Sequence, residues 1–317
     1  MAVGAVTYRR RVETSLTRTW RLAHPVGLGR MLLGRRRGPG DPTYRLEGVG
    51  ERARHWRGLR TPEGAAALVL HQDPDGTVHG EAWGPGARWA FDSVPGLLGQ
   101  HDDPTGFTPD HPVLADAARV VGEVRVGAGG LVMEALVPAV IEQKVTGQEA
   151  FAGFRRLVQR YGERAPGPHE RLFVQPDPER LRTIPSWEWL RLPVDPARSR
   201  AVVTAARVAD SLERTIGLPG DEVERRLTSL PGIGVWTAAE VRQRAHGDAD
   251  AVSFGDYHVA KDVGWAITGE PWDDGELAAF LEPYRPHRNR VVTLLLLAGA
   301  RRPRHGPRMA PRTHLPR

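Results

Sequence analysis

The chain has 317 residues, enough for two domains that each bury a hydrophobic core. It contains no cysteine, which excludes disulfides, a thiol nucleophile, zinc held by thiolates and an iron–sulfur cluster. The net charge of +6 suits a polyanionic partner, although many proteins with neutral ligands are equally basic. Because no apolar run approaches the roughly 18 residues of a membrane span or forms a signal peptide, we expect a soluble cytoplasmic protein.

The first third of the chain predicts a small antiparallel sheet domain with one or two helices, over residues 1–110. The stretch 65–83 contains an apolar run, a turn at Pro74 to Gly76 and an alternating second run, which is the pattern of a β-hairpin. Residues 99–112 are rich in Asp, Pro and Gly and predict a linker.

Residues 111–300 predict an all-α domain, because apolar residues from Leu114 onward recur with helical spacing. We expect helices around 132–140, 151–161, 202–216, 223–230, 238–245, 259–267, 277–281 and 291–298. Asp221 with Glu224, and Asp273 with Glu276, have the spacing of capping boxes. The Arg- and Pro-rich segment 301–317 predicts a disordered tail. The fold class expected for the whole chain is therefore α+β.

The stretch "LPGIGVWTA" at 230–238 interrupts the helical pattern with Pro231, Gly232 and Gly234. Two helices joined in this way form a hairpin whose glycines allow close backbone approach, and whose second helix presents free N–H groups to a phosphate. A simple turn between helices is the plain alternative. A dinucleotide-binding loop is the other alternative, but Thr237 occupies its third glycine position and a helix precedes it where a strand is needed.

Two motifs in register resemble the DNA glycosylase superfamily with a helix-hairpin-helix motif. "LTSLPGIGVWTAAEV" is followed by "AVSFGDYHVAKDVGW", and Asp256 lies 20 residues after Trp236. Further similarity covers 136–164, 199–209 and 284–291, so that the resemblance spans about residues 115–300. Within the superfamily the chain is most similar to bacterial 3-methyladenine DNA glycosylase II.

The resemblance implies an α+β enzyme that flips a damaged nucleotide out of duplex DNA and hydrolyses its N-glycosidic bond. Asp256 matches the catalytic carboxylate, which stabilises the sugar as it becomes cationic. From composition alone, Asp256 would be read as a helix N-cap; the match in register favours the catalytic role, and the two roles are compatible.

Aromatic residues at matching positions would line the base pocket. Trp236 and Tyr257 suit a cationic methylated purine through stacking and cation–π attraction, although both could also be core residues. His287 stands where the family has a stacking tryptophan. Trp187 and Trp189 could also reach the pocket, but for both we expect positions in the core.

Relatives that also cut the DNA strand carry a Schiff-base lysine at the position of Trp236. Lys144 and Lys261 are the only lysines, and neither is at that position. The sequence therefore predicts a monofunctional enzyme without lyase activity.

DNA contact is expected at the hairpin and at the end of an earlier helix. Gln143 and Lys144 occupy the place where the family carries an apolar wedge, and Lys144 is equally well read as an exposed helix residue. The backbone carbonyls of Leu230 and Gly232 are a candidate site for a sodium or potassium ion. Arg242 and Arg244 either contact DNA or are solvated. The full set assigned to DNA contact is Leu230, Gly232, Ile233, Gly234, Thr237, Gln143 and Lys144.

The expected partner is double-stranded DNA with damaged bases, bound by a monomer. Two other classes of function stay open. A helix-hairpin-helix protein without catalytic activity would bind DNA but would not need Asp256. An Arg-rich RNA-binding protein would depend on residues 301–317.

Overall fold

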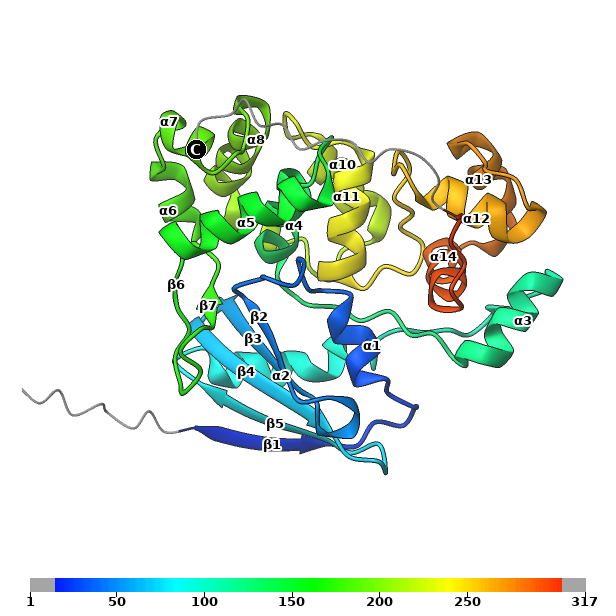
Figure 1. Cartoon of the computed structure of the whole chain (residues 1–317), viewed down its shortest axis with the longest axis horizontal. Coiled ribbons are helices and arrows are strands. Elements are labelled where there is room, and N and C mark those ends of the chain that lie inside the picture. Colours follow the sequence, from blue (N-terminus) through cyan, green and yellow to red (C-terminus); the bar gives the residue numbers. More distant parts are fainter. Residues whose placement is uncertain (1–14, 304–317) are drawn as a thin grey trace, which may run out of the picture.

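The computed structural model describes residues 15–303 and shows an antiparallel sheet on one side of the molecule and most of the helices on the other (Figure 1). The α+β class predicted from the sequence is confirmed. The predicted tail at 304–317 lies outside the described residues. Among the residues that are described, no helix has the length and apolar character needed to cross a membrane.

The sheet has the strand order β1-β5-β4-β3-β2, and every neighbouring pair is antiparallel. The hairpin predicted at 65–83 is confirmed as β4 and β5, with His71 opposite His79 next to the turn that joins the two strands. One face packs on α1 and α2 through a buried core that includes Leu68, Leu70 and Phe91. The strands are β1 (Leu16–Trp20), β2 (Tyr44–Glu47), β3 (Arg54–Thr61), β4 (Gly64–Gln72) and β5 (Val78–Trp83), and the helices are α1 (Leu28–Leu33) and α2 (Ala87–Leu97).

The other face of the sheet is covered by a segment from the helical part of the chain. The short strands β6 (Glu163–Arg164) and β7 (Phe173–Val174) reach down to the sheet, where Val174 packs in a cluster with the stacked rings of Trp56 and Trp83 (Figure 1). At Gly58, an added Cβ would lie 2.0 Å from the carbonyl oxygen of Phe173. The sheet and the helical part therefore share a core, and β3 approaches β7 too closely for any side chain at Gly58.

The predicted linker at 99–112 contains no helix or strand before α3 (Pro112–Val121), but it is firmly anchored. Asp102 accepts two hydrogen bonds of 2.7 Å from the guanidinium of Arg290, a residue that is only 1% exposed. Arg290 belongs to α14 (Arg288–Leu297), so this buried ion pair joins the connection to the last helix.

The helical part contains three groups of helices in chain order. The first is α4 (Val132–Ile141), α5 (Gly147–Tyr161), α6 (Pro178–Thr183) and α7 (Ser186–Arg191). The second is α8 (Pro196–Arg207), α9 (Ala209–Glu213), α10 (Gly220–Thr228), α11 (Val235–Val241) and a π-helical turn at Arg242–His246. The third is α12 (Val259–Thr268), α13 (Asp274–Leu281) and the 3₁₀ turn Glu282–Tyr284, which pack with α3 and α14. A further 3₁₀ turn, Gly50–Arg52, lies between β2 and β3.

The single helix predicted at 202–216 is wrong, because the chain breaks at Val208 between α8 and α9. Beyond the break, Glu213 accepts hydrogen bonds of 2.8 Å from the backbone N–H groups of Val132 and Met133 at the start of α4. Burial raises the pKa of this carboxyl above its ordinary value, against the effect of the two backbone donors. A straight helix to residue 216 would not give this cap.

Of the two predicted capping boxes, one forms. Asp273 and Glu276 exchange both hydrogen bonds at the start of α13. The capping box predicted at Asp221 and Glu224 does not form. Helix α10 begins at Gly220, directly after Pro219, and has no side-chain cap. Glu224 is used instead in an ion pair with Arg242.

We expect Gly58→Ala to destabilise the protein by about 1–3 kcal/mol, because the added methyl group must push β3 away from β7. The measurement is the midpoint of chemical denaturation. Gly29→Ala in α1 is the matched control, since its added Cβ would meet only the ring of His55 at 3.7 Å. Equal midpoints for the two variants would contradict the close approach.

Candidate functional site

The hairpin between α10 and α11 has one glycine that the fold itself requires. Gly232 has φ +86°, and an added Cβ would lie 2.8 Å from the Cβ of Ala201 on α8. Next to it, Ile233 is buried in the helical core, and Leu230 packs against the same core. Two apolar side chains thus anchor the loop while its backbone stays at the surface.

No contact within the fold requires a glycine at position 234. Its φ of −101° is open to any residue, and an added Cβ would meet no atom within 4 Å. Gly234 and Val235 are exposed, with Val235 55% accessible. The surface at the start of α11 is therefore free for a molecule that approaches the backbone closely.

The side chain of Gln143, just after α4, holds this loop through two hydrogen bonds. Its amide nitrogen donates to the carbonyl oxygen of Gly232 at 2.9 Å and to the hydroxyl of Thr237 at 2.8 Å. Thr237 is only 2% exposed, so its side chain faces the interior. The structure thus places both residues in the support of the hairpin.

Lys144 comes directly after Gln143 in the turn between α4 and α5. It is exposed and has φ +53°, a conformation uncommon for a residue with a side chain. The side chain therefore starts from a turn at the surface and not from a helix, which corrects the alternative of an exposed helix lysine.

Asp256 lies just before α12 and is held by three N–H groups. Its Oδ1 accepts from the backbone N–H of His258 at 2.7 Å and of Val259 at 3.1 Å. Its Oδ2 accepts from the indole Nε1 of Trp236 at 3.2 Å. The carboxylate thus satisfies the first donors of α12, as an N-cap does, and remains partly exposed.

The contact with Trp236 joins the two sequence motifs, since Trp236 is the second residue of α11 and Asp256 precedes α12. Beside the carboxylate in the chain, Tyr257 is 68% exposed and is not a core residue. The ammonium of Lys261 lies 3.6 Å from the centroid of its ring. The indole of Trp236 thus contacts Asp256 directly, and Lys261 covers the ring of the next residue in the chain.

His287 is placed differently from the other aromatic candidates. It is buried, its Nε2 lies 3.1 Å from the carbonyl oxygen of Thr105, and its Nδ1 lies 3.3 Å from Nε of Arg290. Because arginine only donates, these partners fit a neutral ring with its proton on Nε2. The ring packs edge-on against Phe107. Both ring nitrogens are thus bonded within the chain.

The carbonyls considered for a monovalent cation each have an internal partner. The oxygen of Leu230 accepts from the N–H of Ile233 at 3.0 Å, and that of Gly232 accepts from Gln143. A carbonyl oxygen has two lone pairs, so each retains one for a cation.

Other candidates have internal roles. Arg242 is buried between Glu224 and Asp248, and Arg244 pairs with Glu240, so neither is a solvated or DNA-facing cation in this structure. Trp189 is buried as expected, but Trp187 is 63% exposed and is not a core residue.

Sequence reasoning missed the contacts that hold the loop before Asp256. Ser253 donates to Glu240 of α11 at 2.7 Å and accepts from Gln243 at 2.9 Å. On the other side, the N–H of Gly255 donates to Asp274 at 2.8 Å. No periodic pattern in the sequence marks such long-range polar pairs.

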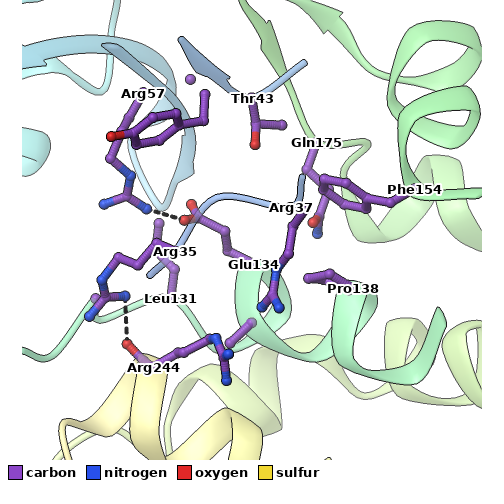
Figure 2. A pocket seen from close by; sticks show the side chains of 14 residues that line it. Arg35, Arg37, Thr43, Arg57, Leu131, Glu134, Pro138, Phe154, Gln175 and Arg244 are labelled. Carbon is purple, nitrogen blue, oxygen red and sulfur yellow. Dashed lines mark hydrogen bonds and ion pairs between the residues drawn. The ribbon is translucent and has the colours of Figure 1, made fainter. Parts of the chain in front are cut away.

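A cavity of about 40 Å³ lies where the sheet meets the helices, and it is lined by residues other than Asp256, Trp236 and Tyr257. Figure 2 shows Arg35, Arg57 and Glu134 gathered around it, with Arg57 paired to Glu134. Burial, reinforced by the charge of Arg57, lowers the pKa of Arg35 to about 9. The volume is enough for a few water molecules and too small for a purine.

Comparison with known proteins gives a short sequence match and a long structural one. No protein-family model matches the chain. A Mycobacterium tuberculosis protein described as a probable bifunctional transcriptional activator and DNA repair enzyme, AlkA, is 34% identical over 131 residues. The match covers 39% of this chain and 25% of that protein, so the chain spans about a quarter of the length of this relative.

Two solved structures match about nine tenths of the chain. The 3-methyladenine DNA glycosylase of Archaeoglobus fulgidus is 19% identical with a TM-score of 0.75, and the match covers 89% of this chain and 98% of that one. The 8-oxoguanine glycosylase/lyase of Clostridium acetobutylicum is 11% identical with a TM-score of 0.67, covering 90% and 97%. The resemblance carried by the two motifs is thus confirmed: the chain has the fold of the helix-hairpin-helix DNA glycosylases.

Proposed function

We propose that the protein is a monofunctional DNA glycosylase of base excision repair, acting on alkylated purines of the 3-methyladenine type in duplex DNA. The observation that carries the proposal is the carboxylate of Asp256, partly exposed, held by three N–H donors and joined to the hairpin through Trp236. The similarity to the 3-methyladenine glycosylase of Archaeoglobus fulgidus and to the AlkA protein supports it.

In the proposed reaction, the bond between the anomeric carbon and the base nitrogen breaks, and its electron pair leaves with the base. The sugar becomes an oxocarbenium-like cation, which the fixed negative charge of Asp256 stabilises. Water then adds to the anomeric carbon and loses a proton, so that an abasic site and a free base remain. A carboxylate already oriented by three donors does not have to reorganise when the charge develops.

The flipped base would lie against Trp236 and Tyr257. A methylated purine is cationic, and the exposed face of Tyr257 suits such a ring. Since His287 is buried with both nitrogens bonded within the chain, we propose that its role is structural and that it does not stack on the base. A cationic base would also compete with the ammonium group of Lys261 for the ring of Tyr257.

Duplex DNA would be held at the hairpin, where the exposed backbone around Gly234 accepts a phosphate and the carbonyls of Leu230 and Gly232 retain lone pairs for a sodium or potassium ion. Lys144 would enter the duplex or contact a phosphate beside the flipped base. A crystal structure of the Clostridium acetobutylicum 8-oxoguanine glycosylase/lyase with double-stranded DNA, at a TM-score of 0.62 and 12% identity over 84% of this chain, supports such a use of the fold.

We further propose a monomer with a sheet domain at 1–110 and a glycosylase domain at 111–300.

Asp256→Asn should lower single-turnover base release from methylated duplex DNA by at least about 100-fold, because it removes the charge that the sugar cation requires. Asparagine is itself a good N-cap, so the start of α12 should stay intact. The measurement is the rate of base release at saturating enzyme, with DNA affinity measured in parallel.

Asp221→Asn is the matched control, since Asp221 is an exposed acid at the start of α10. It should release base at the wild-type rate. Equal rates for Asp256→Asn and the wild type would leave a DNA-binding protein without catalytic activity as the better proposal.

The wild type should leave abasic sites uncut and should form no covalent adduct with DNA under borohydride, because Trp236 stands in the place of a Schiff-base lysine. Lys261 is the lysine to test, since it lies against the ring of Tyr257, the residue that follows Asp256 in the chain. A borohydride adduct that disappears in Lys261→Met but persists in Lys144→Met would show lyase chemistry and contradict the monofunctional assignment.

Gly234→Ala should weaken binding to duplex DNA several-fold while leaving the denaturation midpoint unchanged, because its added Cβ faces open space where the DNA backbone would approach. Gly232→Ala is the contrasting variant and should lose stability, because φ is +86° and Ala201 lies close. Unchanged DNA affinity in Gly234→Ala would place the DNA elsewhere.

A further inference from the structure

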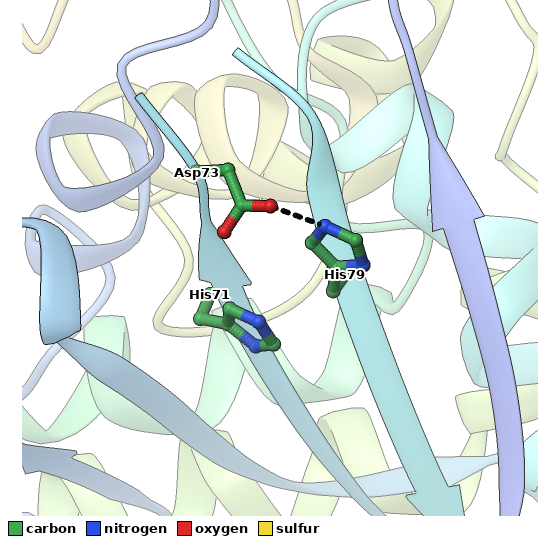
Figure 3. A group of neighbouring side chains, drawn as sticks. All are labelled: His71, Asp73 and His79. Carbon is green, nitrogen blue, oxygen red and sulfur yellow. Dashed lines mark hydrogen bonds and ion pairs between the residues drawn. The ribbon is translucent and has the colours of Figure 1, made fainter. Parts of the chain in front are cut away.

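Three side chains at the end of the β4–β5 hairpin could hold a metal ion. His71, Asp73 and His79 each offer one ligand atom, and these atoms lie within 4.8 Å of one another (Figure 3). His71 and His79 face each other across the two strands, with ring centroids 5.0 Å apart and planes inclined by 14°. Strand pairing thus fixes the spacing of the two imidazoles.

The turn that carries Asp73 is ordered. The N–H of Asp73 donates to the carbonyl of Thr77 at 2.9 Å, and the N–H of Gly76 donates to the carbonyl of Asp73 at 3.0 Å. Both histidines are half-buried and Asp73 is exposed. The backbone that carries the three side chains is therefore ordered, and the group is open to solvent at Asp73.

Imidazole nitrogen and carboxylate oxygen are ligands that first-row divalent ions such as zinc accept. With bonds of about 2.1 Å, neighbouring ligand atoms around a tetrahedral ion lie about 3.4 Å apart. The ligand atoms lie within 4.8 Å of one another, so the side chains would rotate to close on a bound ion.

The second nitrogen of His79 also has the partner that a ligating histidine needs. Nε2 of His79 lies 2.8 Å from Oδ2 of Asp73, and Nδ1 lies 3.3 Å from the hydroxyl of Thr19 on β1. If an ion replaces the proton on Nε2, the ring proton moves to Nδ1 and donates to the Thr19 hydroxyl. A hydrogen bond of this kind orients the ring and strengthens the metal bond.

A plain ion pair between His79 and Asp73 accounts for their contact but gives no role to His71, whose ring stacks on His79. We propose that His71, Asp73 and His79 form a binding site for a divalent transition-metal ion of the zinc class, with water completing the coordination. The bound ion would cross-link β4 and β5 next to the turn that joins them. This site lies on the sheet, whereas Asp256 lies between α11 and α12.

The test is isothermal titration of Zn²⁺ into the full chain after treatment with a chelator, together with Tm at increasing Zn²⁺. The wild type should bind at this site with micromolar affinity and gain thermal stability. His71→Ala, His79→Ala and Asp73→Asn should each weaken this binding by at least about tenfold and lose the zinc-dependent rise in Tm. Using three variants keeps the test valid if one of them fails to fold.

His101→Ala is the matched control, because His101 is an exposed histidine outside the hairpin, and it should bind Zn²⁺ as the wild type does. Thr19→Val should weaken binding by a smaller factor, because it removes the partner of Nδ1 alone. Wild-type affinity in both histidine variants, or no zinc-dependent change in Tm of the wild type, would overturn the proposal.

Discussion

A carboxylate that stabilises a sugar cation is useful only when its position relative to the bound DNA is fixed. In this protein the connection is short: the indole of Trp236 bonds to Asp256, and Gln143 bonds to the loop just before Trp236. The loop from 251 to 256 is held in turn by Ser253 on Glu240 and by Gly255 on Asp274. These hydrogen bonds connect α11 to the segment before α12, and the proposed chemistry depends on that connection.

The use of arginine shows how the charge of the chain should be interpreted. The basic composition suits a polyanionic partner, but several arginines form ion pairs and hydrogen bonds inside the fold. Arg290 bonds to Asp102, Arg242 to Glu224 and Asp248, and Arg198 to Asp195 and the carbonyl of Ile141. Buried guanidinium groups with such partners tie distant segments together. The net charge of +6 therefore says little about which surface would meet DNA in the proposed function, and the exposed hairpin backbone is the stronger indication.

The sheet and the helical part of the molecule are not separable units in packing. The segment 163–174 leaves α5, covers one face of the sheet and returns to the helices, and Gly58 permits this contact. Asp102 anchors the connection between the two parts to α14. The proposed metal ion at His71 and His79 would lie on the two interior strands β4 and β5, beside the turn that joins them.

The sequence by itself determined the class of the fold, most helices, the β4–β5 hairpin and the pairing of a Leu-Pro-Gly hairpin with a later aspartate, because periodicity, turn residues and motif spacing are local signals. It did not determine the break at Val208, the missing box at Asp221, or the burial of Arg242 and His287. Each of these is decided by a partner far away in the chain: Glu213 caps α4, Glu224 pairs with Arg242, and His287 packs on Phe107. Only the tertiary structure brings such partners together, since burial of a polar group is favourable only where another group satisfies it.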